Sequence, residues 1–253
     1  MNISNQCVLE LKDLGLKIGG ARIIENVNLE VAQGEFLGVI GPNGAGKTTL
    51  FNLISGVMDP TEGEIFLRSN PLSPLGIEQR ARAGLGRTFQ TSSLFPRLSV
   101  FENVRLAAQV KAGGEISLLK FPNRVDEAAE IALQKLEEVG LGAKTDAIAG
   151  VMSHGEKRKL EIAMLLASDP EVILFDEPMA GVASGDVQGL VEVIARVHQL
   201  GKTVLMVEHH IEVVLDLADR VAVLHNGQVL AADSPDQIMA NTAVQSAYLG
   251  ESA

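Results

Sequence analysis

Apolar residues follow two different patterns along the chain, and each predicts a different kind of strand. In residues 8–11 and 27–31 apolar and polar positions alternate, which is typical of a strand with one face in the core and one in water. Residues 36–40, 172–175 and 203–207 are apolar at nearly every position, as expected of central strands buried on both faces. We therefore predict a half-exposed sheet near the start of the chain and a buried core sheet.

Helical periodicity dominates the sequence between the first two buried strands. Residues 126–139 place apolar side chains at positions 129, 133 and 136 among carboxylates, and this amphipathic helix ends near Gly140. Residues 160–167 form a more apolar helix, which stops before Pro170. Strands that alternate with helices predict an α/β fold, here a parallel core sheet with a helical insertion between its strands.

Two further segments complete this outline. Residues 221–224 begin a last hairpin, which turns at the Asn-Gly pair of residues 226–227. Residues 111–124 contain two adjacent glycines and a proline and follow neither period, so we interpret them as a mobile loop.

Composition narrows the class of protein. The 253 residues are 46% apolar and 21% charged, which is ordinary for a globular protein, and no run of about 18 apolar residues could cross a bilayer. A net charge of −11 argues against broad binding to nucleic acid or anionic lipid. The single cysteine, Cys7, excludes an internal disulfide, and no secretory signal is recognisable in residues 1–10. We expect a cytosolic protein.

Residues 41–48, which read Gly-Pro-Asn-Gly-Ala-Gly-Lys-Thr, fit the P-loop pattern between a buried strand and a helical segment. Glycines let backbone N–H groups curl around phosphate oxygens, and the helix that follows adds its positive end. The alternative is a chance glycine-rich turn. In the P-loop interpretation Lys47 reaches the β- and γ-phosphates and Thr48 places its hydroxyl on Mg²⁺. The predicted nucleotide-binding residues are Gly41, Pro42, Asn43, Gly44, Ala45, Gly46, Lys47, Thr48 and Thr49.

Two carboxylates end the buried strand at residues 172–175. A strand that ends in Asp176 and Glu177 places both at the carboxyl edge of the sheet, beside the P-loop. Asp176 suits the water shell of Mg²⁺, and Glu177 suits the orientation and polarisation of an attacking water. Without a P-loop in the same chain, solvated charges at a strand end would explain them equally well.

Three further sites stay open on the residues alone. Ser153 and Gly155 start a helix, where they form either an anion site or a plain N-terminal cap. His209 follows the strand at 203–207, and it is either a ligand of a phosphate oxygen or a structural histidine. Gln90 follows a short predicted strand and has no role that its chemistry alone assigns.

Taken in order, these motifs resemble those of ATP-binding-cassette (ABC) ATPases over nearly the whole chain. The resemblance implies one ABC ATPase domain of the P-loop type, with a RecA-like core, an antiparallel β subdomain and an α-helical subdomain. The implied parts are the β subdomain with the P-loop core at 1–90, the helical subdomain at 91–167, and the rest of the core with the C-terminal segment at 168–253.

The resemblance also implies site roles in a head-to-tail dimer that binds ATP and Mg²⁺. It assigns hydrolysis to Glu177, His209, Gln90 and Lys47, metal binding to Thr48, Gln90 and Asp176, the adenine contact to Ile18, and the γ-phosphate contact in trans to Ser153 and Gly155. Here Ile18 replaces the usual aromatic residue, His154 and Glu156 alter the usual Leu-Ser-Gly-Gly-Gln signature, and Ala183 replaces the usual Asp or Asn. We therefore expect hydrolysis, slowed by these departures or dependent on a partner.

Residues 86–90, 94–104 and 247–250 narrow the resemblance to the longer ATPase subunit of branched-chain and hydrophobic amino acid importers. In that family a second, related ATPase, two membrane permeases and an extracytoplasmic binding protein complete the system, and the ATPase lies on the inner face of the membrane. Either permease docking or core packing would explain the apolar residues Leu94, Phe95, Leu98 and Phe101. The alternatives are an ABC ATPase of an export or assembly machine, and a nucleotide-gated scaffold that barely hydrolyses ATP.

Overall fold

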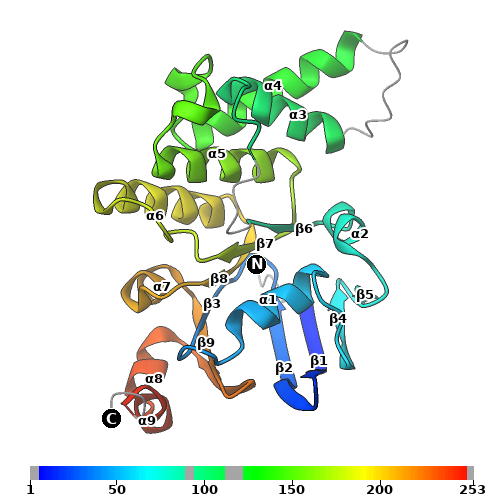
Figure 1. The fold of residues 1–253 in the computed structure, drawn as a ribbon, viewed down its shortest axis with the longest axis vertical. Coiled ribbons are helices and arrows are strands. Elements are labelled where there is room, and N and C mark those ends of the chain that lie inside the picture. The colour runs from blue at the N-terminus through cyan, green and yellow to red at the C-terminus, as the bar shows by residue number, and fades with distance from the viewer. Residues whose placement is uncertain (1–5, 89–93, 112–121, 250–253) are drawn as a thin grey trace. The chain divides into compact units, whose positions relative to one another are not determined.

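A six-stranded sheet contains the continuous apolar runs of the sequence, in the order β10-β9-β3-β8-β7-β6. The computed structural model describes residues 6–88, 94–111 and 122–249, and its ribbon is drawn in Figure 1. Strands β6, β7, β8, β3 and β9 are parallel, and β10 joins β9 as an antiparallel hairpin. The strands are β3 (Phe36–Ile40), β6 (Leu85–Arg87), β7 (Val172–Asp176), β8 (Thr203–Val207), β9 (Arg220–His225) and β10 (Gln228–Asp233). The predicted parallel core sheet is confirmed.

The apolar composition of the central strands explains their burial, and a specific turn explains the hairpin of β9 and β10. Every residue of β3, β7 and β8 is buried, as their unbroken apolar runs predict. Asn226 and Gly227 both have positive φ, at 50° and 77°, which is the backbone that a tight two-residue hairpin needs. The hairpin predicted there is therefore confirmed.

An antiparallel sheet in the order β2-β1-β4-β5 packs on the same core. It consists of β1 (Cys7–Ile18), β2 (Ala21–Ala32), β4 (Glu62–Leu67) and β5 (Asn70–Pro71). Apolar residues from both sheets and from α1 form one cluster, so the helix that follows the P-loop packs between the two sheets. The helices of this part of the chain are α1 (Lys47–Ser55), α2 (Ile77–Arg82), α7 (Ile211–Leu217), α8 (Pro235–Ala240) and α9 (Thr242–Leu249).

Contacts divide the chain into two units. The core unit comprises Met1–Arg87, Glu171–Glu177 and Gly201–Ala253, and the helical unit comprises Thr88–Pro170 and Pro178–Leu200. In the helical unit α5 packs on α3, α4 and α6. These helices are α3 (Val100–Lys111), α4 (Pro122–Glu138), α5 (His154–Ala167) and α6 (Ser184–Gln199), with short 3₁₀ turns at Gly142–Lys144 and Ala149–Val151.

Helix α4 differs from the prediction in two respects. It begins at Pro122 rather than at residue 126, because proline lacks the N–H that a first helical turn leaves unbonded. Residues 122–124 of the predicted mobile loop are therefore helical, Lys111 ends α3, and residues 112–121 lie outside the described part of the chain. The buried stripe also includes Ala128, Ala132 and Leu136, whereas Leu133 is 48% exposed, because small alanines let neighbouring helices approach closely.

Gly38 in β3 lets α7 lie directly on the core sheet. A Cβ atom at this position would lie 2.2 Å from Cγ1 of Val214 in α7 and 3.4 Å from the Ala218 Cβ. The close approach matters for function because β3 leads into residues 41–48, while α7 follows the segment that carries His209.

We therefore expect Gly38→Ala to lower the free energy of unfolding by about 1–3 kcal/mol, the usual effect of overpacking a core. Gly185→Ala is the matched control, since Gly185 lies in α6 with no atom within 4 Å of a new Cβ. That variant should keep its stability or gain up to about 1 kcal/mol from helix propensity. Urea denaturation of both proteins measures the difference, and equal stabilities would refute this account of Gly38.

Candidate functional site

The P-loop joins the carboxyl end of β3 to the first turn of α1 and depends on glycine backbone geometry. Gly41 has φ 156°, and a Cβ there would lie 2.1 Å from the carbonyl oxygen of Leu224. Gly46, the N-terminal cap residue of α1, has φ 102°, a conformation that glycine adopts without strain. The loop therefore turns tightly against β9 and leaves Asn43, Gly44 and Thr48 exposed.

Lys47 is held inside its own loop. The residue is 6% exposed, and its Nζ donates hydrogen bonds to the carbonyl oxygens of Gly41 and Pro42, at 2.6 and 2.8 Å. An ammonium group beside a helix N-terminus makes this loop a strong site for anions. A phosphate chain is the ligand that fits such an arrangement.

Backbone register places the acidic residues at the same edge of the sheet as the P-loop. Val207 at the end of β8 pairs with Val39 of β3 on one side and with Asp176 of β7 on the other. The three strands therefore end level with one another, and the segments that follow them emerge together. This places the P-loop, Asp176, Glu177 and His209 at one edge of the sheet.

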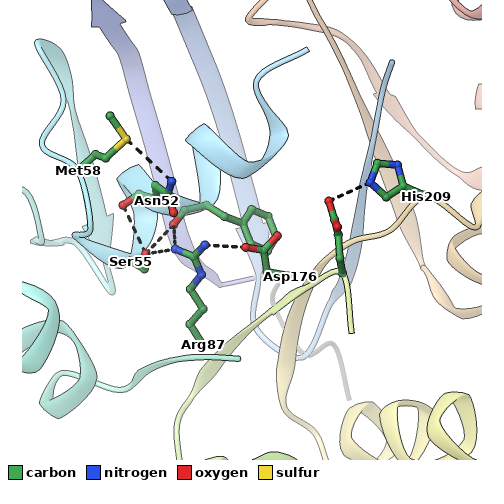
Figure 2. A network of polar contacts seen from close by, with 8 residues as sticks. Asn52, Ser55, Met58, Arg87, Asp176 and His209 are labelled. Atoms are coloured by element: carbon green, nitrogen blue, oxygen red, sulfur yellow. Dashed lines mark hydrogen bonds and ion pairs between the residues drawn. The ribbon is translucent and has the colours of Figure 1, made fainter. Parts of the chain in front are cut away.

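Asp176 is buried and paired with Arg87, a residue to which the sequence analysis assigned no role. Arg87 Nη2 lies 2.6 Å from Asp176 Oδ2, and the two side chains are only 6% and 1% exposed. Arg87 Nη1 donates to Ser55 Oγ at 2.6 Å and to the Phe51 carbonyl oxygen at 3.2 Å (Figure 2). In the sequence, the only sign of a role for Arg87 was its charge at the end of a short strand.

Glu177 and His209 form a second pair at this edge. Glu177 Oε1 lies 2.9 Å from His209 Nε2, and the side chains are 18% and 53% exposed (Figure 2). Glu177 has φ 48°, a left-handed conformation that is uncommon for a residue with a side chain, and its N–H donates to the Val207 carbonyl oxygen. Glu208 is buried and accepts a hydrogen bond from the His209 backbone N–H at 3.0 Å, which fixes the base of this histidine.

Two further predicted site residues are Ile18, the proposed adenine contact, and Gln90. Ile18 ends β1 before a two-glycine turn and is 51% exposed, so its side chain is accessible to a ligand. Gln90, predicted as a metal and catalytic residue, lies outside the described residues.

In the helical unit, Ser153 caps α5 through a reciprocal pair of hydrogen bonds. Its Oγ accepts from the Glu156 N–H at 3.2 Å, and a Glu156 carboxylate oxygen accepts from the Ser153 N–H at 2.9 Å. Lys144 forms an ion pair with the same carboxylate, and these partners, Lys144 first, hold the pKa of Glu156 below its ordinary value. Glu156 is thus engaged in the cap and compensated by a cation rather than presented as an isolated negative charge.

A second carboxylate lies against this cap. Asp186 Oδ2 lies 3.3 Å from Ser153 Oγ, and a Cβ at Gly155 would lie 2.6 Å from the Asp186 Cβ. Gly155 is therefore required by the close approach of α6 to the first turn of α5. Asp186 was not identified from the sequence, because only the packing of α6 brings it to the cap.

Comparisons with known proteins show the family of this chain. The family described as "ABC transporter" matches residues 24–180, and the family "Branched-chain amino acid ATP-binding cassette transporter" matches residues 228–253. The chain is 39% identical to the high-affinity branched-chain amino acid transport ATP-binding protein LivG of Escherichia coli K12, covering 98% of this chain and 99% of that protein. It is 35% identical to the lipopolysaccharide export system ATP-binding protein LptB of E. coli K12, covering 96% and 97%.

The fold is similar to that of solved cassettes. The ADP conformation of MJ1267, an ATP-binding cassette of an ABC transporter, superposes with a TM-score of 0.83 at 28% identity, covering 96% of this chain and 99% of that one. Across residues 6–88, 94–111 and 122–249 we find no helix with the length and apolar character that a bilayer crossing requires. The chain belongs to the ABC transporter family and is an ATPase subunit of such a transporter.

Proposed function

We propose that this ATPase subunit drives the uptake of branched-chain or other hydrophobic amino acids. The observation that carries the solute class is the match of residues 228–253 to the branched-chain amino acid cassette family. The identity of 39% with LivG over 98% of the chain supports the same class. The proposal includes as partners a second cassette subunit, two transmembrane permeases and an extracytoplasmic binding protein, with the chain on the cytoplasmic face of the membrane.

A second candidate function is an export machine. The chain is 35% identical to LptB, a lipopolysaccharide export ATPase, so its catalytic motifs alone do not separate the two directions of transport. We rank it second because the family that matches residues 228–253 is described as a branched-chain amino acid cassette, and because the identity to LivG, 39%, is the higher of the two.

Residues 41–49 hold the triphosphate of ATP in this proposal, and Ile18 packs on the adenine. Buried Lys47 supplies a positive charge beside backbone N–H groups at the start of α1, a combination suited to the β- and γ-phosphates. Ile18 offers an accessible aliphatic surface at the end of β1, without the π-face of an aromatic residue.

The residues at this edge of the sheet suit Mg²⁺. Mg²⁺ prefers oxygen ligands and keeps several waters, and in nucleotide sites one or two protein side chains suffice beside the phosphates. Thr48 offers a hydroxyl and Asp176 a carboxylate, and no cluster of three or more His, Cys, Asp or Glu stands among the described residues. Thr48, Asp176 and Gln90 would hold Mg²⁺, which would offset the negative charge of the phosphates when bound.

Hydrolysis then falls to Glu177 and His209. Glu177 orients a water and accepts its proton while the water oxygen bonds to the γ-phosphorus and the bond to the β–γ bridging oxygen breaks. His209, 2.9 Å from Glu177, holds the carboxylate in place and reaches a γ-phosphate oxygen. Lys47 and Gln90 complete the catalytic set.

The second half of each site comes from another cassette in this proposal. Ser153 and Gly155 at the first turn of α5 contact the γ-phosphate of a facing subunit, so that ATP closes the dimer and hydrolysis opens it. A solved cassette, MJ0796 bound to ADP and phosphate, is dimeric and matches 90% of this chain with a TM-score of 0.74 at 28% identity.

The permease contact is proposed on the helical unit. Phe95 is 51% exposed, whereas Leu94, Leu98 and Phe101 are partly buried, so core packing alone does not account for this phenylalanine. Fully buried Asn103 accepts from the Phe95 N–H and donates to the Phe95 carbonyl oxygen, which fixes the exposed turn. A groove of about 350 Å³ nearby is lined by Leu94, Pro96, Lys157 and Arg158 among others.

Affinity purification of the tagged chain from its native membranes, followed by mass spectrometry, tests the assignment to uptake. We expect two multi-span permeases and a second cassette subunit, and the binding protein that belongs with these permeases should bind a branched-chain or hydrophobic amino acid. Co-purification with the components of an export machine would transfer the assignment to the second candidate.

Replacing Glu177 by Gln should reduce ATP turnover by about 10²–10⁴-fold, because the amide cannot accept the proton of water. ATP binding should persist and the closed dimer should accumulate, which sedimentation of the purified protein with ATP would detect. Glu212→Gln, an exposed carboxylate in the first turn of α7, is the matched control and should turn over normally. Normal turnover in Glu177→Gln would remove this residue from the proposed mechanism.

Removing the cation beside the signature should weaken ATP-driven closure. Lys144→Met leaves the Glu156 charge uncompensated near the γ-phosphate of the facing subunit, and we expect the ATP concentration for half-maximal dimer to rise about fivefold. The double variant Lys144→Met/Glu156→Gln removes the charge and should restore the value. If the double variant is as impaired as the single one, charge is not the cause.

A further inference from the structure

The Arg87 guanidinium joins three elements at the base of the nucleotide site. It ends β6, contacts the Asp176 carboxylate at the end of β7, and donates to Ser55 and to a carbonyl oxygen of α1 (Figure 2). Ser55 Oγ is itself tied to its own helix, since it donates to the Phe51 carbonyl oxygen at 2.8 Å. Arg87 is thus a bridge between the acidic strand and the P-loop helix.

Helical geometry shows which face of α1 Arg87 contacts. Ser55 follows Thr48 by seven residues, which is about two turns, so both lie on the same face of α1. Arg87 therefore connects Asp176 to the face of α1 that carries the Thr48 hydroxyl. The planar fork of an arginine can hold a carboxylate and a hydroxyl at once, whereas a lysine offers a single point of charge.

Burial makes the arrangement demanding. Removing two charges from water is unfavourable, and only good geometry with further hydrogen bonds compensates for the lost hydration. The Arg87 and Asp176 side chains are only 6% and 1% exposed, so water stabilises their charges little. Their stabilisation depends on the orientation of each toward the other. Arg87 occupies Oδ2 of Asp176, and a carboxylate has a second oxygen with which to face a hydrated cation.

We propose that Arg87 is a positioning residue for the metal site: it holds the Asp176 carboxylate in register with Thr48, so that both face the same Mg²⁺. The inference rests on the proposed role of Asp176 at the metal. Outer partners that orient a metal ligand typically contribute 10–100-fold to metal affinity, and we expect Arg87 to act in that range.

The test compares the metal affinity of the nucleotide complex across variants, with no dependence on turnover. A fluorescent ADP analogue is titrated with and without Mg²⁺, and Mn²⁺ binding to the ADP complex is followed by electron paramagnetic resonance. Arg87→Met should weaken metal binding roughly 10–100-fold, while the affinity for metal-free ADP, which depends on Lys47 and the loop, stays unchanged.

Arg80 supplies a matched control in the same unit. Its guanidinium is fully buried and donates to the Leu53 and Ile54 carbonyl oxygens at 2.6 and 2.8 Å, so it also holds the end of α1. Its described hydrogen bonds go to carbonyl oxygens. Arg80→Met should therefore lower thermal stability and leave the metal affinity of the ADP complex at the wild-type value.

Two milder variants keep the test decisive if Arg87→Met does not fold. Arg87→Lys keeps the charge but cannot hold Asp176 and Ser55 together. Ser55→Ala removes the hydroxyl that links Arg87 to α1 and leaves the hydrogen bond to the Phe51 carbonyl oxygen. We expect roughly tenfold weaker metal binding in Arg87→Lys and severalfold weaker binding in Ser55→Ala. Wild-type metal affinity in the folded Arg87 variants would overturn the inference.

Asp176→Asn separates this inference from the proposed function. If Asp176→Asn loses metal affinity while the Arg87 variants keep it, the metal role of Asp176 stands and the role of Arg87 falls. If Asp176→Asn keeps wild-type metal affinity, both fall together. Loss in Asp176→Asn and in the Arg87 variants, with an unaffected Arg80→Met, supports the inference.

Discussion

The site of this ATPase depends on the backbone register of three buried parallel strands. Because Val207 pairs with Val39 on one side and Asp176 on the other, the segments after β3, β7 and β8 leave the sheet at one level. The apolar side chains that fill both faces of these strands make a slip in register costly, since it would displace every contact with the helices. The same strand register therefore determines both the stability of the core and the positions of the site residues.

Much of this could be predicted from the sequence because the local signals agree with the tertiary structure. The runs at 36–40, 172–175 and 203–207 permit few alternatives to buried strands, and the P-loop pattern specifies its own turn geometry. Helix α6 and the strands β4 and β5 were not predicted, because their patterns are brief or mixed. The Gln90 position and the exact division into subdomains stay predictions.

Contacts between charged side chains were the least predictable feature. The pairing of Arg87 with Asp176 joins residues 89 positions apart, and the approach of Asp186 to Ser153 depends on how α6 packs on α5. Periodicity identifies which face of an element is buried, but not which residue of another element lies opposite. Glu156 illustrates the difference. Its identity in the sequence suggests repulsion of phosphate, whereas in the structure its negative charge is offset by Lys144 and by the hydrogen bond from the Ser153 N–H.

The left-handed backbone at Glu177 has a consequence for laboratory evolution. A residue with a side chain at φ 48° carries strain on the order of 1 kcal/mol, which glycine would relieve. Selection for heat resistance alone would therefore favour loss of this carboxylate, and with it the proposed chemistry. Libraries built to stabilise the protein should hold position 177 constant, because the residue with the least backbone strain there, glycine, lacks the carboxylate that the proposed chemistry needs.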